Sequence, residues 1–401
     1  MTDTASWLEQ AEACMTPNYR PAPMVISHGD GAQLWDLDGR RYLDFSSGIG
    51  VTQLGHAHPR VVQAIRSQAG KVCHTANMVH QQGYIEVCQR LTELSFGDKV
   101  FLANSGTEAV EAALKISRRH FFDRHDNRTG FVAAVGSFHG RTYGAVTLTG
   151  QPTVQRGMGP LLPNVEHVPY DDADAMRSAV GRTTAAVLLE PIQGNSGVLI
   201  PQPGYLAAVR EICDAAGCLL IFDEVQTGTG RTGRWFAHDH EGVTPDIMTL
   251  AKGLGGGLPL GAMVTTDEIA AALQPGVHAS TLGGNPVACA AALATMDVIR
   301  DDHLLDNATR TGAKLIDRLR DTLGPRDGAV EVRGRGLMIG IELHVPAAQV
   351  KNACFERGLL TTTAGSLVLR LLPPLIIGDD EVDSAVGIIG DAIADTTDQC
   401  G

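Results

Sequence analysis

The middle of the 401-residue chain contains a series of short apolar runs, separated by longer amphipathic stretches. Each run has the length of a β-strand, and most are apolar throughout instead of alternating with polar residues. Strands that are buried on both faces have this pattern, and they occur in parallel sheets covered by helices. We therefore expect an α/β fold with a mostly parallel sheet. The runs are VFLAN (100–104), FVAAVGSF (131–138), AAVLLEP (185–191), CLLIFDEV (218–225), DIMTLAK (246–252) and GAMVTT (261–266).

The segments between and beyond these runs indicate helices and further strands. Helical periodicity is clearest in residues 107–122 and 203–217, and the second segment closes on Gly217, a suitable C-cap. Residues 24–45 contain an Asp-Gly turn between two alternating runs, which is typical of a β-hairpin. After about residue 286 the chain turns helical and then returns to short strands. We expect three parts: residues 1–50, with the hairpin, as part of a small domain; residues 51–287 as a large α/β domain; and residues 288–401 as the rest of the small α+β domain.

Composition excludes several classes of protein. The formal net charge is −13 and there is no long basic run, which argues against nucleic acid and anionic membrane surfaces as partners. No apolar stretch approaches the ~20 residues of a membrane-spanning helix. The N-terminal residues lack the patterns of a signal or transit peptide, and the eight cysteines include no C-x-x-C pair. Reduced thiols in a cytoplasmic protein are the expected reading.

Polar residues follow five of the apolar runs at the point where each run stops. In open parallel sheets the ligand site lies beyond the carboxyl ends of the strands. These polar residues are therefore expected at one edge of the sheet, where they would form a single site. They are Ser105-Gly106-Thr107, His139-Gly140-Arg141, Glu190, Asp223-Glu224 and Lys252.

The chemistry of these residues is that of a phosphate-bearing cofactor with an aromatic ring. Ser105 and Glu108 have capping-box spacing, and a helix N-terminus binds phosphate, although a plain N-cap has the same pattern. Lys252 follows an apolar run, and a buried lysine loses its proton readily and forms Schiff bases. Asp223 ends an apolar run and needs a cationic partner, which the pyridinium nitrogen of pyridoxal phosphate (PLP) would supply. Phe138 can lie flat on such a ring.

Other kinds of site fit the sequence less well. Residues 228–233, GTGRTG, satisfy the G-x-G-x-x-G fingerprint of NAD-dependent oxidoreductases, but no long helix follows them. The pairs His56/His58 and His238/His240 have no clear third ligand, so we expect no metal site. The chain has neither a P-loop nor the G-x-S-x-G turn of serine hydrolases.

At this point the chain resembles the class III (subgroup II) PLP-dependent aminotransferases over nearly its whole length. The resemblance implies the fold-type I architecture, with a large domain and a smaller α+β domain, and a homodimer with shared active sites. Acetylornithine aminotransferases are the most similar subgroup, with ornithine and 4-aminobutyrate enzymes as near relatives. The matching motifs are NSGTEAVEAALK, SFHGRT, EPIQG, LLIFDEVQTGTGRTG, PDIMTLAKGLGGGLPLGA, STLGGNP and VRGRGLMIGIEL.

The same resemblance implies how PLP is held. Lys252 would bind PLP covalently and then move a proton between substrate and cofactor. Asp223 would pair with the ring nitrogen, Phe138 and Val225 would pack on the two ring faces, and Gln226 would hydrogen-bond the ring O3′. The remaining residues implied to bind the cofactor are Ser105, Gly106 and Thr107 at the phosphate, His139 beside Phe138, and Thr281, which reaches the phosphate of the neighbouring subunit.

For the substrates, Arg141 and Arg370 are implied to bind carboxylates, and Glu190 to orient Gln226 and substrate near the ring. Ile49 lies where the family lines its substrate channel, and an apolar residue there suits acetylornithine or a short ω-amino acid. The chain departs from the family at Asn195, where a glutamate usually pairs with the arginine matching Arg370.

The expected reaction moves a terminal amine from a donor such as N-acetylornithine to 2-oxoglutarate, giving an aldehyde and glutamate. A 4-aminobutyrate or 5-aminovalerate aminotransferase, or an enzyme whose donor is altered by Asn195, are the alternatives.

Overall fold

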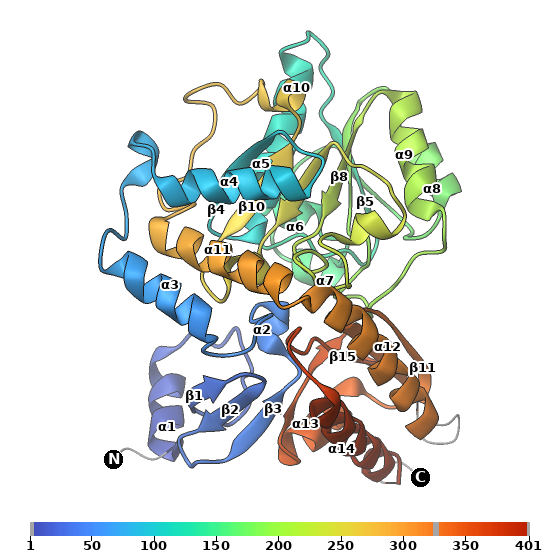
Figure 1. Ribbon diagram of the computed structural model, residues 1–401. Coiled ribbons are helices and arrows are strands. Elements are labelled where there is room, and N and C mark those ends of the chain that lie inside the picture. Colours follow the sequence, from blue (N-terminus) through green and yellow to red (C-terminus); the bar gives the residue numbers. More distant parts are fainter. Residues whose placement is uncertain (1–3, 324–328, 399–401) are drawn as a thin grey trace.

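The computed structural model describes residues 4–323 and 329–398, and its centre is a seven-stranded sheet (Figure 1). The strand order is β4-β10-β9-β8-β7-β5-β6. All neighbouring pairs are parallel except those of β10, which runs antiparallel to both β4 and β9. The expected mostly parallel sheet is thus confirmed. Its strands are β4 Lys99–Ala103, β5 Gly130–Ala134, β6 Val165–Val168, β7 Thr184–Leu189, β8 Leu219–Asp223, β9 Ile247–Leu250 and β10 Gly261–Thr265.

The central strands are apolar throughout because both faces of the sheet are covered. On β7, Leu188 belongs to a core cluster with helix α5, whereas its neighbours Val187 and Leu189 belong to a cluster with helices α8 and α9. On β8, Ile221 faces the first cluster and Phe222 the second. No position on these strands faces water, so no alternation with polar residues arises. The covering helices of this part are α3 Pro59–Ala69, α4 Gln82–Leu94, α5 Gly106–Phe122, α6 Tyr143–Leu148, α7 Pro152–Gln155, α8 Ala173–Ala179, α9 Tyr205–Ala216 and α10 Asp267–Ala270.

Two of the local expectations are confirmed and one is corrected. Helix α5 coincides with the predicted helix, and α9 ends at Gly217, whose φ of 64° is the left-handed C-cap conformation. Strand β5 is shorter than predicted and ends at Ala134. The residues after it turn away from the sheet, with Gly136 at φ 81°, and form the loop that carries Phe138 and His139.

The N-terminal and C-terminal parts of the chain lie on the same side of the large sheet (Figure 1). The Asp-Gly turn of the N-terminal hairpin is present, with Gly39 at φ 81° between β2 and β3. Strand β3 pairs in parallel with β13, so the first 50 residues share a sheet with the C-terminal part. The strands of these two smaller sheets are β1 Ile26–Asp30, β2 Gln33–Asp36, β3 Arg41–Asp44 and β13 Leu359–Leu360, then β11 Ala329–Arg335, β12 Met338–Leu343, β15 Val368–Leu371 and β14 Thr362–Ala364.

Long helices join the two parts. Helix α11 packs on α3 and α4, whereas α12 packs on α14 and β11. The domain boundaries predicted at residues 50 and 287 stay a prediction, and residues 1–3 and 399–401 of the predicted domains lie outside the described residues. The helices not yet named are α1 Thr4–Cys14, α2 Ser47–Gly50, α11 Pro286–Asp301, α12 Leu304–Thr322, α13 Ala347–Glu356 and α14 Asp379–Asp398, with short 3₁₀ turns at η1 Ala76–Met78, η2 Ala237–His240 and η3 Lys252–Gly255.

The structure bears on two expectations from composition, which concern membrane-spanning helices and the state of the cysteines. Within residues 4–323 and 329–398, no helix has the length and hydrophobicity needed to cross a membrane. The cysteines in these ranges are free thiols, and Cys400 lies outside the described residues.

Candidate active site

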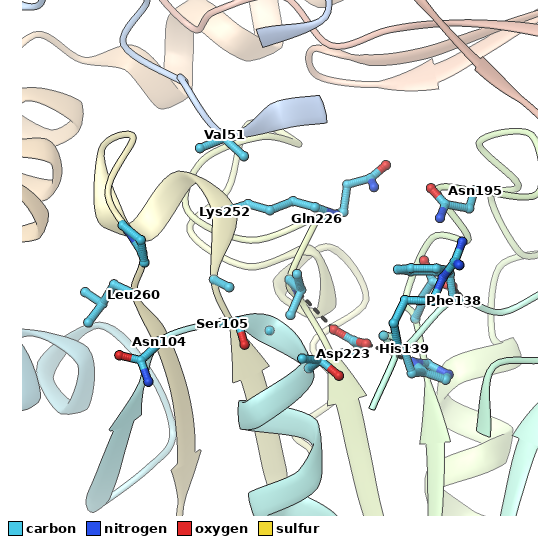
Figure 2. A pocket seen from close by; sticks show the side chains of 18 of the residues that line it. Val51, Asn104, Ser105, Phe138, His139, Asn195, Asp223, Gln226, Lys252 and Leu260 are labelled. Atoms are coloured by element: carbon cyan, nitrogen blue, oxygen red, sulfur yellow. Dashed lines mark hydrogen bonds and ion pairs between the residues drawn. The ribbon is translucent and has the colours of Figure 1, made fainter. Parts of the chain in front are cut away.

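A cavity of about 490 Å³ opens at the carboxyl edge of the large sheet. Figure 2 shows Asp223 at the end of its strand, with Ser105 and Lys252 on one side and Phe138 and His139 on the other. The polar residues that follow five separate strands therefore lie around one space. The predicted residues that line it are Ser105, Gly106, Thr107, Phe138, His139, Arg141, Glu190, Asn195, Asp223, Val225, Gln226 and Lys252.

One wall of the cavity is the N-terminus of helix α5. Ser105 is its N-cap, and the Ser105 hydroxyl accepts a hydrogen bond from the backbone N–H of Glu108, as the capping-box pattern predicts. A Cβ added at Gly106 would lie 2.8 Å from either Cγ atom of Val225, so only glycine fits there. The first backbone N–H groups of a 17-residue helix face the cavity and suit an anion such as a phosphate group.

Asp223 lies at the floor of the cavity and is only 4% exposed. Its Oδ2 accepts a hydrogen bond from His139 Nδ1 at 2.7 Å. Its Oδ1 accepts from the backbone N–H of Val225 and from the Thr249 hydroxyl, both at 3.1 Å. No lysine or arginine of the described residues forms an ion pair with this carboxylate. A buried carboxylate without a cationic side chain suits a cationic ligand atom.

Glu190 is the second buried carboxylate of the site. It accepts hydrogen bonds from the backbone N–H groups of Phe138, at 2.9 Å, and Gly194, at 3.0 Å. Burial raises the pKa of Glu190 above its ordinary value, and the nearby Asp223 carboxylate adds to this effect. Glu190 thus fixes two loops on either side of the cavity. The Arg141 guanidinium lies over the Phe138 ring, 5.6 Å from its centroid, at the exposed side of the site.

Lys252 follows strand β9 and adopts a left-handed backbone conformation, with φ 43°. This conformation is unfavourable for a residue with a side chain and is held here by close packing: a Cβ on the next residue, Gly253, would lie 2.3 Å from Gln53. Burial among protein atoms lowers the pKa of Lys252 to about 8, and the positive charge of Arg370 adds to the effect. About a tenth of the amine is therefore neutral at pH 7, and this fraction can act as a nucleophile.

Arg370, on strand β15, approaches the site from the smaller sheet. Its Nη1 donates to Asn195 Oδ1 at 2.7 Å and to Gln226 Oε1 at 3.1 Å, and its Nε donates to Thr362. Among the described residues, Nη2 has no hydrogen-bond partner. No carboxylate forms an ion pair with Arg370 in the described part of the chain. Burial lowers the pKa of Arg370 to about 10, so it remains protonated near neutral pH. This cation suits a carboxylate of a substrate.

With this geometry established, similarity to known proteins identifies the family. The model of the aminotransferase class-III family matches residues 14–393. The chain belongs to this family. It is 44% identical to an acetylornithine aminotransferase of Methanothermobacter thermautotrophicus over 98% of this chain and 100% of that protein. It is 48% identical to an acetylornithine aminotransferase of Streptomyces coelicolor over 95% of this chain and 94% of that protein.

Solved structures agree with the class III aminotransferase fold. The ornithine aminotransferase of Toxoplasma gondii superposes with a TM-score of 0.96 at 35% identity, covering 100% of this chain and 97% of that one. The acetylornithine aminotransferase of Elizabethkingia anophelis superposes with a TM-score of 0.88 at 33% identity, covering 98% of this chain and 100% of that one. The predicted fold-type I architecture is thus confirmed, and the protein is a PLP-dependent aminotransferase.

The residues of this aminotransferase fit PLP. A helix N-terminus with a side-chain-free Gly106 accommodates a phosphate, and Lys252 provides an amine of lowered pKa. Asp223, buried without a cationic side chain, suits the ring nitrogen. Gln226 uses its Oε1 to accept from Arg370, which leaves its amide N–H groups for the oxygen beside the ring. Phe138 and Val225 both line the space where the ring would lie.

Three predicted site residues do not line the cavity. Arg370 reaches it only through Asn195 and Gln226. Ile49 is 48% exposed in a turn with φ 67°, and Val51 lines the cavity instead. Thr281 is exposed and lines a separate hollow beside Glu108. The roles predicted for these three stay predictions.

The alternative of a dinucleotide loop is wrong. Residues 228–233 are all buried, and Arg231 in their middle is fully enclosed, donating to the backbone carbonyls of Leu337 and Pro373. The loop therefore joins the cofactor site to the C-terminal part and has no surface for a nucleotide. Three of the four histidines considered as metal ligands have other partners: His56 bonds Asp44, His238 bonds Glu224, and His240 bonds the Thr232 carbonyl. The described residues contain no group of three metal-ligating side chains.

Several lining residues were not singled out from the sequence. Asn104 directly precedes the α5 N-cap, and Gly257 to Leu260 form the turn after Lys252. Because these residues directly neighbour predicted site residues in the sequence, their place in the site could have been predicted. Thr249 does not line the cavity but donates to Asp223, and the sequence gives no signal for it because a threonine inside an apolar strand is common in sheets.

Proposed function

We propose that this aminotransferase moves the terminal amine of N-acetylornithine to 2-oxoglutarate, giving the corresponding aldehyde and glutamate. The observation that carries this proposal is the full-length similarity to acetylornithine aminotransferases, at 44% identity over all of one such enzyme. The presence of two guanidinium groups at the site, Arg141 and Arg370, fits a co-substrate with two carboxylates.

In this proposal PLP supplies an electron sink, and the protein's own residues do the rest. Lys252 would hold the cofactor and then move a proton at the substrate carbon that carries the amine, Cδ of N-acetylornithine or Cα of glutamate, for which its pKa of about 8 suits it. Asp223 pairs with the ring nitrogen, and Phe138 and Val225 hold the ring from its two faces. Gln226 donates to the ring O3′.

The remaining roles concern the phosphate and the substrates. Glu190 keeps Phe138 and the Gly194 loop in place beside the substrate. Arg141 and Arg370 bind the substrate carboxylates, and Ile49 borders the entrance. The residues proposed to surround the cofactor phosphate are Ser105, Gly106, Thr107 and, from a second copy of the chain, Thr281.

A homodimer is part of this proposal. Thr281 lies in an exposed loop and does not line its own cavity, so within one chain it cannot contact the cofactor phosphate. A second copy that supplied this residue would complete the site, and cyclic dimers are the commonest assemblies of this kind.

A second candidate is an ω-amino acid aminotransferase that acts on 4-aminobutyrate or 5-aminovalerate. It is compatible with Asn195, since Arg370 is left without a carboxylate partner and could bind the carboxylate of such a donor, as it could that of N-acetylornithine. The test is kcat/KM for a panel of amine donors with 2-oxoglutarate as acceptor. A preference for N-acetylornithine supports the first proposal, and a preference for 4-aminobutyrate or 5-aminovalerate replaces it with the second.

A further inference from the structure

The two carboxylate oxygens of Asp223 have different hydrogen-bond partners. A carboxylate oxygen has two lone pairs that accept hydrogen bonds in the plane of the group. Oδ1 already accepts two, from the Val225 N–H and the Thr249 hydroxyl, each at 3.1 Å. Oδ2 accepts one, from His139 Nδ1 at 2.7 Å. One lone pair of Oδ2 is therefore left, and it is the one free to accept a further donor.

Thr249 is placed for this task by the sheet itself. It is the residue of β9 that lies opposite Asp223 of β8 in the parallel register. The backbone carbonyl of Thr249 accepts from the N–H of Glu224 at 2.9 Å, which fixes the threonine relative to the end of β8. Its side chain is fully buried, and its χ1 angle is restricted because it is β-branched. The hydroxyl donates to Oδ1 at 3.1 Å from this position.

The other donors cannot replace this bond. The Val225 N–H and Oδ1 belong to the same short turn after β8, so they move together with Asp223. His139 comes from a different loop and binds the other oxygen. Thr249 is thus the donor that ties Oδ1 to a neighbouring strand.

We propose that Thr249 is a positioning residue for transamination: by donating to Oδ1 it orients the Asp223 carboxylate so that Oδ2 meets the ring nitrogen of PLP. The proposal rests on the function proposed above, in which Asp223 pairs with that nitrogen. In this proposal the two oxygens of Asp223 have different roles. Oδ1 is held by Thr249 of the neighbouring strand, and Oδ2 accepts from His139 and pairs with the cofactor.

The test is Thr249→Val, which removes the hydroxyl and keeps the shape of the side chain. A hydrogen bond to a charged group corresponds to a factor of ten or more in an equilibrium. In the holoenzyme, the visible absorbance of bound PLP changes with pH. We expect the apparent pKa of this change to rise by about one pH unit in the variant. The single-turnover rate with L-glutamate should fall about tenfold, while the dissociation constant of 2-oxoglutarate stays unchanged.

Two further variants separate the hydroxyl from packing. Thr249→Ser keeps the donor and should restore the band and the rate. Thr265→Val is the matched control: Thr265 is equally buried, but its hydroxyl donates to the backbone carbonyl of Asp246 at the opposite edge of the sheet. This control should leave the absorbance band as in the wild type.

The outcomes are decisive in each case. A wild-type band and rate in Thr249→Val overturn the inference, as does a Thr249→Ser variant that behaves like Thr249→Val. If Thr249→Val yields no folded holoenzyme, Thr249→Ala is measured with the same expectation. Asp223→Asn tests the underlying function: if it leaves the band and the rate unchanged, the pairing of Asp223 with the ring is wrong. If Asp223→Asn abolishes turnover while Thr249→Val changes nothing, only the role of Thr249 is wrong.

Discussion

At the scale of single residues, the site contains two buried basic side chains, Lys252 and Arg370. Burial lowers the pKa of both Lys252 and Arg370, and the positive charge of Arg370 lowers that of Lys252 further. The buried carboxylates of Asp223 and Glu190 oppose this effect at Lys252. The balance leaves Lys252 near the point of losing its proton while Arg370 stays charged.

This balance predicts how covalent attachment of PLP depends on pH. The pKa of Lys252 is lowered from 10.5 to about 8, so its neutral, nucleophilic form dominates above pH 8 instead of above 10.5. The rate at which the apoenzyme attaches PLP should rise about tenfold per pH unit below pH 8 and level off above it. Stopped-flow absorbance over pH 6 to 10 measures this rate. A rise that continues to pH 10 would contradict the lowered pKa.

Asn195 predicts a second effect at this scale. Its side-chain oxygen accepts from Arg370 at 2.7 Å, but it carries no charge and cannot neutralise the guanidinium. Asn195→Glu would form an ion pair that competes with a substrate carboxylate. We expect weaker binding of L-glutamate and 2-oxoglutarate, by about tenfold, because a hydrogen bond between charged groups is worth about 1.5–3 kcal/mol.

The measurement is the single-turnover conversion of bound PLP with L-glutamate and with N-acetylornithine, in the wild type and in Asn195→Glu. The ratio of the rate with glutamate to that with N-acetylornithine should fall in the variant. An unchanged ratio would mean that Arg370 is equally available with either residue at position 195.

At the scale of elements, the start of helix α5 depends on a position without a side chain. A Cβ at Gly106 would lie 2.8 Å from both Cγ atoms of Val225, on the residue proposed to pack against the ring. Gly106→Ala should therefore displace the helix start or Val225 and weaken PLP binding by at least tenfold, measured by equilibrium dialysis. Gly387→Ala is the control, since Gly387 lies exposed in α14 with no atom within 4 Å of an added Cβ. That variant should bind PLP normally and gain roughly 0.5–1 kcal/mol of stability from helix propensity.

Some strands of the large sheet could be predicted from the sequence and others could not. The strands covered on both faces are continuous apolar runs, so their presence and their polar ends were predictable from the sequence. Strand β6, Val165–Val168, was not predicted, because it is an edge strand and alternates between partly buried and exposed residues over only four positions. The end of β5 was predicted too late, because the apolar residues after Ala134 continue into a loop.

Some residues of the site, too, could be predicted from the sequence alone and others could not. Residues that directly follow a buried strand, such as Asp223 and Lys252, were predictable because the sheet alone brings them to one edge. Arg370 comes from another sheet, and only resemblance to the family indicated it. The contact between Thr249 and Asp223 depends on strand register, which the sequence of each strand alone does not specify.

At the scale of the whole molecule, the buried GTGRTG loop connects the cofactor site to the C-terminal part. The carbonyl of Arg231 accepts from the N–H of Leu337, and its guanidinium donates to Leu337 and Pro373. Pro373 lies three residues after Arg370, so the same loop that follows Asp223 also contacts the chain just beyond the strand that carries Arg370, the arginine proposed to bind substrate. The residues proposed to bind the cofactor and the arginine proposed to bind substrate are therefore linked through contacts of one buried loop.

The proposed dimer makes a prediction at this scale that a single chain cannot satisfy. If Thr281 contacts the cofactor phosphate of the second copy, then Thr281→Glu should inactivate the partner's site by placing a carboxylate beside the phosphate. Lys252→Ala should inactivate a site on its own chain. A hybrid of the two variants would contain one site with both lesions and one site with neither. Random mixing of two inactive proteins should therefore restore about a quarter of wild-type activity, because about half of the dimers are hybrids with one intact site. The activity of co-refolded mixtures measures this, with each variant refolded alone as control. If the mixture stays as inactive as its components, Thr281 does not act across a shared site.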